Sequence, residues 1–409
     1  MLERQRDKLR RLLAALIAAN VFYGRKLVQT GINEPTEDAF RRLPPTTKHE
    51  LLADQEVSPP YGTNLTYPLE RYVRLHQTSG TKGTPLRWLD TQESWDWMLG
   101  CWRRIFALTG VKPGDRLFFP FSFGPFLGFW TAFEAATRLG CLCIAAGGMS
   151  TKARLRLLVD NEARVMLCTP TYALHLAEAA AQEGIAIRGA LNTIIVAGEP
   201  GGSIPATRER IEEAWGARLF DHSGMTEVGP MTIGCVNRRG CLHVLEEDYL
   251  AETLDPNSLQ PTPEGEIGEL CVTNLGRIAS PVLRYRTGDL VRVSTQPCPC
   301  GLPYLTLEGG ILGRVDDMIA IRGNNFFPSA LENVLRRFPE IGEYQVRVDT
   351  SSPLAELRVE IETSGHDEAL PARVRQTIRD ELFFRADVTL ATPGSLPRYE
   401  MKAKRVIVQ

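Results

Sequence analysis

The sequence lacks both a long apolar segment and an excess of charge of one sign. No apolar run reaches the roughly 20 residues that span a bilayer, so we expect no membrane-spanning helix. The formal net charge is −2, which provides no basic face for nucleic acid or for an anionic membrane surface. A chain of 409 residues, 43% hydrophobic and 23% charged, is typical of a globular protein with two or three domains.

The sequence also lacks the regular cysteine spacing of a disulfide framework. It has nine cysteines, an odd number, scattered over a long chain. Cys141, Cys143, Cys168 and Cys271 lie in apolar, strand-like runs, where a reduced thiol behaves as a small hydrophobic side chain. This pattern predicts a reducing, cytoplasmic compartment.

The N-terminus allows two interpretations. Basic residues through Arg11 precede an apolar run that ends at Ala19, as in a secretory signal. Leucines at helical spacing favour the alternative, an amphipathic helix with one apolar face. We predict the helix, whose apolar face would carry Leu9, Leu12, Leu13 and Leu16.

Short strand-like runs alternate with helical stretches over the first half of the chain. This alternation predicts an α/β fold with largely parallel sheets. A strand over 72–76 leads into a glycine-rich loop, and Thr91 is placed to cap a helix that ends near Gly110. Further strands are predicted over 117–120, 141–145, 165–168 and 193–196.

The pattern changes in the second half. After Glu264, closely spaced strands with Gly and Pro turns predict a small antiparallel β subdomain. From Gly313 onward a compact α+β segment follows, with the domain boundary at Arg314–Asp317. We therefore expect a large N-terminal domain, 1–313, and a small C-terminal domain, 314–409. The predicted elements of the latter are helices over 328–338 and 370–382 and strands over 344–349 and 356–362.

The glycine-rich loop suits the binding of a phosphate. Glycines let the backbone approach a phosphate closely, and hydroxyl and N–H groups supply hydrogen-bond donors. The spacing of a Walker loop is absent, and taken alone the segment also fits a hairpin turn. The loop reads Thr78-Ser79-Gly80-Thr81-Lys82-Gly83-Thr84-Pro85.

Further polar segments follow this loop in a fixed order. In that order they resemble the adenylate-forming (AMP-binding) enzymes, and within those the phenylacetate–coenzyme A ligase family. The resemblance extends from the first helix to Lys402 near the end of the chain. The segments are Gly198-Glu199-Pro200, Asp221-His222-Ser223-Gly224-Met225-Thr226-Glu227, Tyr285-Arg286-Thr287-Gly288-Asp289, Gly313-Arg314-Val315-Asp316-Asp317 and Leu396-Pro397-Arg398-Tyr399-Glu400-Met401-Lys402.

The resemblance implies a role for each segment. ATP would be bound by Thr78 to Gly83, by Gly198 to Pro200 and by Asp221 to Met225. Asp289 would accept hydrogen bonds from the ribose hydroxyls. Glu227 would bind a Mg²⁺ ion, for which a carboxylate oxygen is a suitable hard ligand.

The remaining roles concern catalysis and the movement of the C-terminal domain. Thr226 would contact the α-phosphate. Arg314 would also bind ATP, and it lies next to the hinge residue Asp316. Lys402 would be catalytic, because an ammonium group between a carboxylate and the α-phosphate lowers their repulsion in the transition state.

The sequence departs from the family at three of these positions. Ser223 stands where the family has an aromatic residue, and Met401 replaces the glycine before the catalytic lysine. Lys82 replaces Thr or Ser, and it either adds a charge contact to the phosphates or points into solvent.

A second constellation is rich in thiols. Three cysteines and one histidine suit a tetrahedral structural Zn²⁺, and buried reduced thiols are the alternative. The family carries a Cys, a Gly-Leu-His and a Cys-Pro-Cys-Gly at matching places, with Cys241 here in place of the first glycine and therefore a substitute ligand to consider. The predicted ligands are Cys235, His243, Cys298 and Cys300.

The stretch over 118–130 is unusually aromatic. Such a run belongs either to the core or to the wall of a pocket for a flat apolar acid. By position in the family it borders the acyl site, and we expect Phe123 and Gly124 to face the ligand.

These features predict an ATP-dependent acid–thiol ligase. It would join a phenylacetate-like carboxylic acid to ATP and pass the acyl group to coenzyme A. A carrier-protein thiol or an amine is the alternative acceptor, and a nucleotide-binding protein without catalysis is the alternative of another class. We expect no nucleic-acid or membrane partner, and the sequence leaves a homodimer open.

Overall fold

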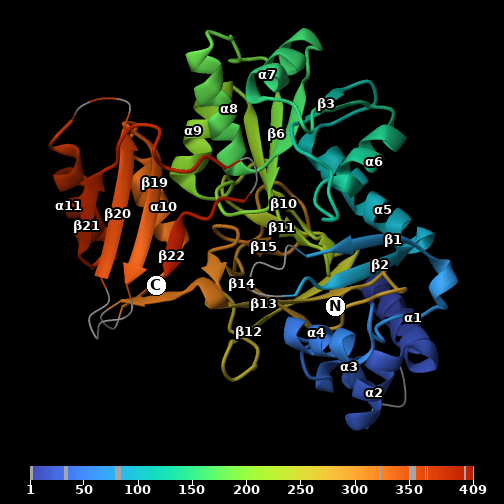
Figure 1. Ribbon diagram of the computed structural model, residues 1–409. Coiled ribbons are helices and arrows are strands. Elements are labelled where there is room, and N and C mark those ends of the chain that lie inside the picture. The colour runs from blue at the N-terminus through green and yellow to red at the C-terminus, as the bar shows by residue number, and fades with distance from the viewer. Residues whose placement is uncertain are drawn as a thin grey trace.

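The α/β architecture combines one parallel sheet with several antiparallel ones. A large N-terminal part lies beside a smaller C-terminal sheet, which stands on the left in Figure 1. This arrangement confirms the predicted fold class. The computed structural model describes residues 3–31, 36–78, 84–321, 324–349, 356–363, 365, 367–399 and 402–408.

The chain begins with a group of helices at the edge of the large part (Figure 1). The four leucines of the predicted amphipathic face are buried on α1, where they pack with Leu250 and Leu275, and the helix is confirmed. Thr47 and Glu50 form a capping box that fixes the start of α4. The helices are α1 (Glu3–Ala19), α2 (Val21–Gln29), α3 (Glu37–Arg42) and α4 (Lys48–Val57).

The central five-stranded sheet is parallel, with the order β4-β3-β5-β6-β7. Four of its short strands, β3 to β6, are predicted correctly within one residue, whereas β7 was not predicted. The five strands are β3 (Arg116–Phe119), β4 (Leu142–Ala145), β5 (Val165–Cys168), β6 (Thr193–Ala197) and β7 (Arg218–His222). The associated helices are α5 (Gln92–Thr109), α6 (Trp130–Leu139), α7 (Thr151–Asp160), α8 (Pro170–Gln182) and α9 (Pro205–Trp215).

Capping residues set the limits of these helices. Thr91 accepts a hydrogen bond from the Ser94 N–H at the start of α5, and Gly110 ends that helix in a left-handed conformation, as predicted. Thr169 caps α8 in the same way. Because the helices begin or end at these residues, loops connect them to the carboxyl ends of the strands. In sheets of this type, ligands bind at those loops.

Antiparallel sheets complete the large part. The prediction that they begin after Glu264 was wrong, because Thr232 already starts a strand. This strand pairs with the strand over 242–244, which in turn pairs with β15, far along the chain, so local turn spacing could not reveal the whole sheet. The strands are β1 (Tyr72–Gln77), β2 (Arg87–Thr91), β8 (Gly224–Met225), β9 (Gly229–Pro230), β10 (Thr232–Gly234), β11 (Leu242–Val244), β12 (Tyr249–Leu254), β13 (Ile267–Asn274), β14 (Tyr285–Arg292), β15 (Thr306–Leu307) and β16 (Gly313–Arg314).

The C-terminal part has its own sheet and its own core. The sheet order is β21-β20-β19-β22, and a separate apolar cluster begins at Ile319. The predicted helices and strands are all present. The elements of this part are β17 (Ile319–Ile321), β18 (Asn324–Phe326), α10 (Pro328–Arg336), β19 (Ile341–Asp349), β20 (Glu356–Thr363), α11 (Leu370–Leu382), β21 (Ala386–Leu390) and β22 (Val406–Val408).

The connection to the C-terminal part is a 3₁₀ turn over Val315–Asp317. Near the end of the chain, β22 pairs in parallel with β19. This pairing holds in place the residues that precede β22. In the part of the chain that the structure describes, no helix is both long and apolar enough to cross a membrane.

Candidate active site

The loops at the carboxyl edge of the parallel sheet carry several predicted site residues. β6 ends at Ala197, and Gly198-Glu199-Pro200 follows directly. β7 ends at His222, before the segment that contains Thr226 and Glu227. Neighbouring parallel strands end at the same edge, so these two segments lie next to one another.

Asp221 and His222 are buried and stabilise this edge from within. Asp221 accepts hydrogen bonds from Ser203 Oγ (2.6 Å) and from the His222 N–H (3.0 Å). Burial raises the Asp221 pKa to about 6. His222 Nδ1 lies 2.6 Å from the Thr232 carbonyl oxygen, and burial lowers the His222 pKa to about 4, so the imidazole is neutral at pH 7.

A tight hairpin presents Thr226 and Glu227. β8 pairs with β9, and the turn between them carries both residues. Glu227 is buried, with 4% of its surface exposed. Its Oε1 atom lies 3.0 Å from Lys48 Nζ and accepts a hydrogen bond from Tyr285 Oη (3.3 Å). The carboxylate is therefore held by α4 on one side and β14 on the other.

A fully buried ion pair stabilises the same hairpin through a contact with its backbone. Arg277 donates to both oxygens of Asp90, with Nε–Oδ1 at 2.6 Å and Nη2–Oδ2 at 2.5 Å. Its remaining Nη1 group donates to the carbonyl oxygen of Thr226 (2.6 Å). The guanidinium thus fixes the backbone of the turn, because a planar bidentate contact allows little rotation.

Asp289 pairs with Arg314 across neighbouring strands. β14 and β16 align the two residues, and Arg314 Nη1 donates to Asp289 Oδ1 (2.8 Å). Burial raises the Asp289 pKa to about 6, against the opposing effect of the Arg314 charge. Arg314 also donates to Asp316 Oδ1 (3.0 Å), so the proposed ribose ligand and the proposed hinge share one guanidinium.

Lys402 reaches this group of charges from the C-terminal part. Part of its side chain is exposed, but its ammonium end is enclosed, with Cε near the position that a Cβ atom on Gly198 would take. Burial and the Arg314 charge lower the Lys402 pKa below its ordinary value, while Glu199, Asp289 and Glu227 act in the opposite direction. The structure thus brings the lysine near residues of four other predicted segments.

The aromatic stretch forms a cluster of rings beside the sheet. The Phe123 ring lies 4.5 Å from the ring of Trp130 and 5.2 Å from the rings of Phe121 and Phe133, between centroids. Trp130 Nε1 donates to the Gly124 carbonyl oxygen (3.0 Å), which fixes the loop. Phe123 and Gly124 are half-buried, as residues at the border of a pocket would be.

The glycine-rich loop is described only at its ends. The Thr78 N–H donates to the Leu86 carbonyl oxygen (3.0 Å), and Thr78 Oγ1 accepts a hydrogen bond from the Leu86 N–H (3.0 Å). This closes the base of the loop. The predicted residues that lie outside the described part of the chain are Ser79, Gly80, Thr81, Lys82 and Gly83.

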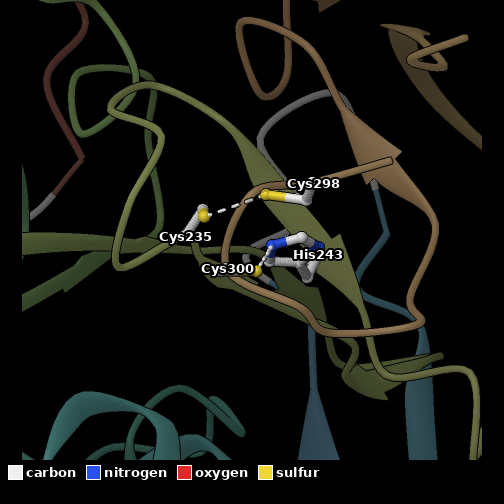
Figure 2. Close-up of side chains that lie close together, drawn as sticks. All are labelled: Cys235, His243, Cys298 and Cys300. Carbon is white, nitrogen blue, oxygen red and sulfur yellow. Dashed lines mark hydrogen bonds between the residues drawn. The ribbon is translucent and has the colours of Figure 1, made fainter. Parts of the chain in front are cut away.

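The predicted zinc ligands come together at one point (Figure 2). Their ligand atoms all lie within 4.8 Å of one another, and Cys241 is outside this set. His243 directs Nε2 towards Cys300 Sγ (3.3 Å), while its Nδ1 lies 3.3 Å from Thr306 Oγ1. A second partner on the other ring nitrogen is the usual environment of a histidine that binds a metal. The four residues are Cys235, His243, Cys298 and Cys300.

Comparison with known proteins explains this arrangement. The family model described as "AMP-binding enzyme" matches residues 49–277, and that of the "AMP-binding enzyme C-terminal domain" matches residues 323–409. The phenylacetate–coenzyme A ligase of Thermus thermophilus is 32% identical over 98% of this chain and 95% of its own length. That of Escherichia coli is also 32% identical, over 94% of this chain and 89% of its own. The chain belongs to the phenylacetate–coenzyme A ligase family of AMP-binding enzymes.

Solved structures indicate which conformation this family member adopts. 2-Hydroxyisobutyryl-CoA ligase in its postadenylation state, with an acyl-AMP, matches with a TM-score of 0.93 and 30% identity over 99% of this chain and 89% of that one. The same enzyme in its thioesterification state, with coenzyme A, gives a TM-score of only 0.74 over 99% and 88% of the two chains. The two parts of this ligase-family chain are therefore arranged as in the postadenylation state.

Sequence reasoning missed the residues that hold this ligase-family site together across long distances. Lys48 follows a recognisable capping box, which predicts the start of a helix but not its contact with Glu227. Arg277 and Asp90 are 187 positions apart, and neither carries a local signal. Only the fold brings such pairs together.

Proposed function

We propose that the protein activates a carboxylic acid with ATP and transfers the acyl group to the thiol of coenzyme A. The observation that carries this proposal is the position of Lys402, whose ammonium lies near enough to Asp289, Arg314 and Glu227 for their charges to act on its pKa. In our proposal the large domain comprises residues 1–313, and residues 314–409 form a lid over the site.

In the first half-reaction, a carboxylate oxygen of the acid attacks the α-phosphorus of ATP, and pyrophosphate leaves. The Lys402 ammonium lies between the two anions and offsets their repulsion as they approach. Asp289 accepts the ribose hydroxyls, and Thr226 contacts the α-phosphate. The buried donors around Asp221 keep the nucleotide segment in place.

Two metal ions fit the residues present. Glu227 offers a buried carboxylate oxygen that would hold Mg²⁺, which neutralises charge on the ATP phosphates. Lys48, half-exposed and at the same carboxylate, is free to turn towards the phosphates. Cys235, His243, Cys298 and Cys300 would hold a structural zinc ion.

In the second half-reaction, the coenzyme A thiol attacks the acyl carbon, and AMP leaves. The lid would first rotate about Asp316, which withdraws Lys402 and admits the thiol. The separate core of the C-terminal part supports a rigid-body motion, because that part keeps its own packing as it turns.

The aromatic wall that includes Phe123 supports a flat apolar acid of the phenylacetate type. All nine cysteines are free thiols, which supports a cytoplasmic compartment. A carrier-protein thiol or an amine remains the alternative acceptor, and a homodimer the alternative to a monomer.

Pyrophosphate release with a panel of aromatic and aliphatic acids tests the proposal. With ATP, Mg²⁺ and coenzyme A, we expect turnover that is greatest for aryl-acetic acids. Turnover that is the same with and without coenzyme A would indicate that another acceptor takes the acyl group. No pyrophosphate release with any acid of the panel, together with ATP binding measured by calorimetry, would instead favour a nucleotide-binding protein without catalysis.

The division of labour between the half-reactions is tested with Lys402→Ala. We expect adenylation to fall by about 10²–10³-fold, the usual effect of removing one charge-stabilising group from a transition state. Conversion of a supplied acyl-adenylate and coenzyme A into thioester should be retained, because Lys402 has then left the site. Equal loss of both half-reactions would refute the assignment.

A further inference from the structure

The Glu199 carboxylate, which follows β6 at the carboxyl edge of the parallel sheet, contacts the lid. Its Oε2 atom accepts a hydrogen bond from the Ala403 N–H (2.6 Å), one residue beyond Lys402. Its Oε1 atom accepts one from the Thr171 N–H (2.9 Å), in the first turn of α8. The two oxygens of one carboxylate thus join the backbones of the large domain and the lid.

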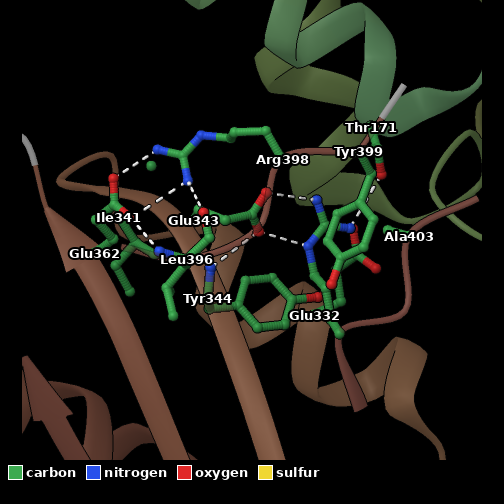
Figure 3. Close-up of polar contacts among 12 residues, drawn as sticks. Thr171, Glu332, Ile341, Glu343, Tyr344, Glu362, Leu396, Arg398, Tyr399 and Ala403 are labelled. Atoms are coloured by element: carbon green, nitrogen blue, oxygen red, sulfur yellow. Dashed lines mark hydrogen bonds and ion pairs between the residues drawn. The ribbon is translucent and has the colours of Figure 1, made fainter. Parts of the chain in front are cut away.

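A second contact between the two parts lies beside this bridge. Arg405 Nη1 donates to Thr171 Oγ1 (3.0 Å). The same guanidinium is held by Glu343 of β19, with Nε–Oε1 at 2.6 Å and Nη2–Oε2 at 3.0 Å. Figure 3 shows Thr171 and Ala403 next to the face of the lid that carries Glu343 and Tyr344. Thr171 is therefore contacted through both its backbone and its side chain.

The bridge holds the part of the lid that carries Lys402. The bond to Ala403 stands one residue from the lysine, and the Glu199 charge also acts on the Lys402 ammonium. Gly198, adjacent to Glu199, adopts φ = +98°, which lets the backbone turn so that Lys402 Cε approaches it. A small displacement of Ala403 therefore moves the ammonium directly.

The bond also depends on the arrangement of the two parts. It joins residues 204 positions apart, and it forms in the arrangement that matches the postadenylation state of 2-hydroxyisobutyryl-CoA ligase. A lid rotation of the kind needed for thioester formation separates Ala403 from Glu199, while the bond to Thr171, within the large domain, can remain.

We propose that Glu199 is a positioning residue for adenylation, a latch whose hydrogen bond to Ala403 holds Lys402 in the site and whose release frees the lid for thioester formation. This inference rests on the proposed function for its link to catalysis. The latch itself is a physical contact and can be tested without activity.

The test uses Glu199→Gln in the full-length chain. Glutamine has nearly the same shape but offers one acceptor oxygen and one NH₂ group, so one of the two backbone N–H donors faces another donor. The matched control is Glu209→Gln, which makes the same change of charge at an exposed position on α9. Equal melting temperatures of the two variants would exclude a general loss of structure.

The first readout is hydrogen–deuterium exchange of a peptide that covers 402–408. We expect faster exchange at Ala403 in Glu199→Gln than in the wild type or the control, with unchanged exchange in β19. Exchange at 402–408 that stays as slow as in the wild type overturns the latch. This readout needs no substrate and does not depend on the identity of the acid.

The second readout compares the two half-reactions. In Glu199→Gln we expect adenylation to fall by about 10- to 100-fold, since a hydrogen bond to a charged group contributes to that extent. Thioester formation from supplied acyl-adenylate should be unchanged or faster, because the lid is released. A parallel loss of both half-reactions overturns the positioning role. If exchange at Ala403 changes but the wild type adenylates no acid, the contact stands and the proposed function fails.

Discussion

At the scale of single residues, Asp289 has to be buried and negatively charged at once. Only 5% of the surface of this residue is exposed, and its burial raises the pKa to about 6. An aspartate in an unfolded chain titrates near about 3.9. Ionisation of Asp289 therefore lowers the free energy of unfolding. The contribution of this group to stability is largest below about pH 3.9 and is lost as the pH rises through about 6.

Asp289 should make nucleoside binding depend on pH. As the pH falls below about 6, the carboxyl group gains a proton and loses acceptor capacity for the ribose hydroxyls. We expect the affinity for adenosine to fall by up to about tenfold one pH unit below this pKa. Calorimetry with adenosine between pH 5 and pH 8 measures it without interference from a titrating phosphate.

Asp221 provides the control for this experiment, because its pKa is also raised to about 6. In Asp289→Asn, we expect weak binding with little dependence on pH. If the variant keeps the full pH dependence of the wild type, Asp221 causes the effect and the assignment of Asp289 to the ribose is wrong.

At this scale, the sequence offers candidate site residues where a local motif surrounds them. Asp289, Arg314, Glu227 and Lys402 were named from short segments, and the fold brings their charges into one group. Lys48 and Thr171 were not found, because no local pattern reveals their distant partners. Lys48 contacts Glu227, and Thr171 contacts Arg405, which lies 234 positions away.

At the scale of elements, the β8–β9 hairpin depends on the buried pair of Asp90 and Arg277. We expect Arg277→Met to destabilise the protein by about 3–5 kcal/mol, because it leaves Asp90 charged and unpaired in the core. The double variant Arg277→Met, Asp90→Leu should recover much of this loss, since it removes both buried charges. Denaturant unfolding measures both changes.

The same double variant separates stability from function. It restores an apolar interior, but the Thr226 carbonyl oxygen still lacks the donor that Arg277 provides. We therefore expect ATP binding to stay weakened by about tenfold even where stability is regained. A double variant that binds ATP like the wild type would show that Arg277 serves the core alone.

Elements were predictable where their limits are set locally. The start of α5 follows from Thr91 and its end from Gly110, both visible in the sequence. The antiparallel strand β10 was missed because it has only three residues and belongs to a sheet whose third strand, β15, pairs with β11 from a distant segment. Likewise the sequence predicted β19 and β20 of the C-terminal sheet but neither β21 nor β22, which pairs with β19 in parallel.

At the scale of the whole molecule, the cysteine cluster joins segments that are far apart in the chain. Cys235 follows β10, His243 lies on β11, and Cys298 and Cys300 precede β15. β10 packs on β7, with Gly234 against the backbone of Asp221. A zinc ion at this point would therefore anchor the loop beneath the nucleotide segment, so its removal should be felt at the active site as well as in overall stability.

We expect one zinc ion per chain, measured by elemental analysis, and a melting temperature that falls by more than about 5 °C when a chelator removes it. Cys300→Ser should lower the zinc content, whereas Cys241→Ala should not, because Cys241 stands outside the set of four. Readdition of zinc should restore both the melting temperature and ATP affinity. An unchanged melting temperature in the chelated protein, with no zinc detected before treatment, would mean that the four side chains form a buried cluster of reduced thiols, and that hydrophobic packing alone holds β10 against the nucleotide segment.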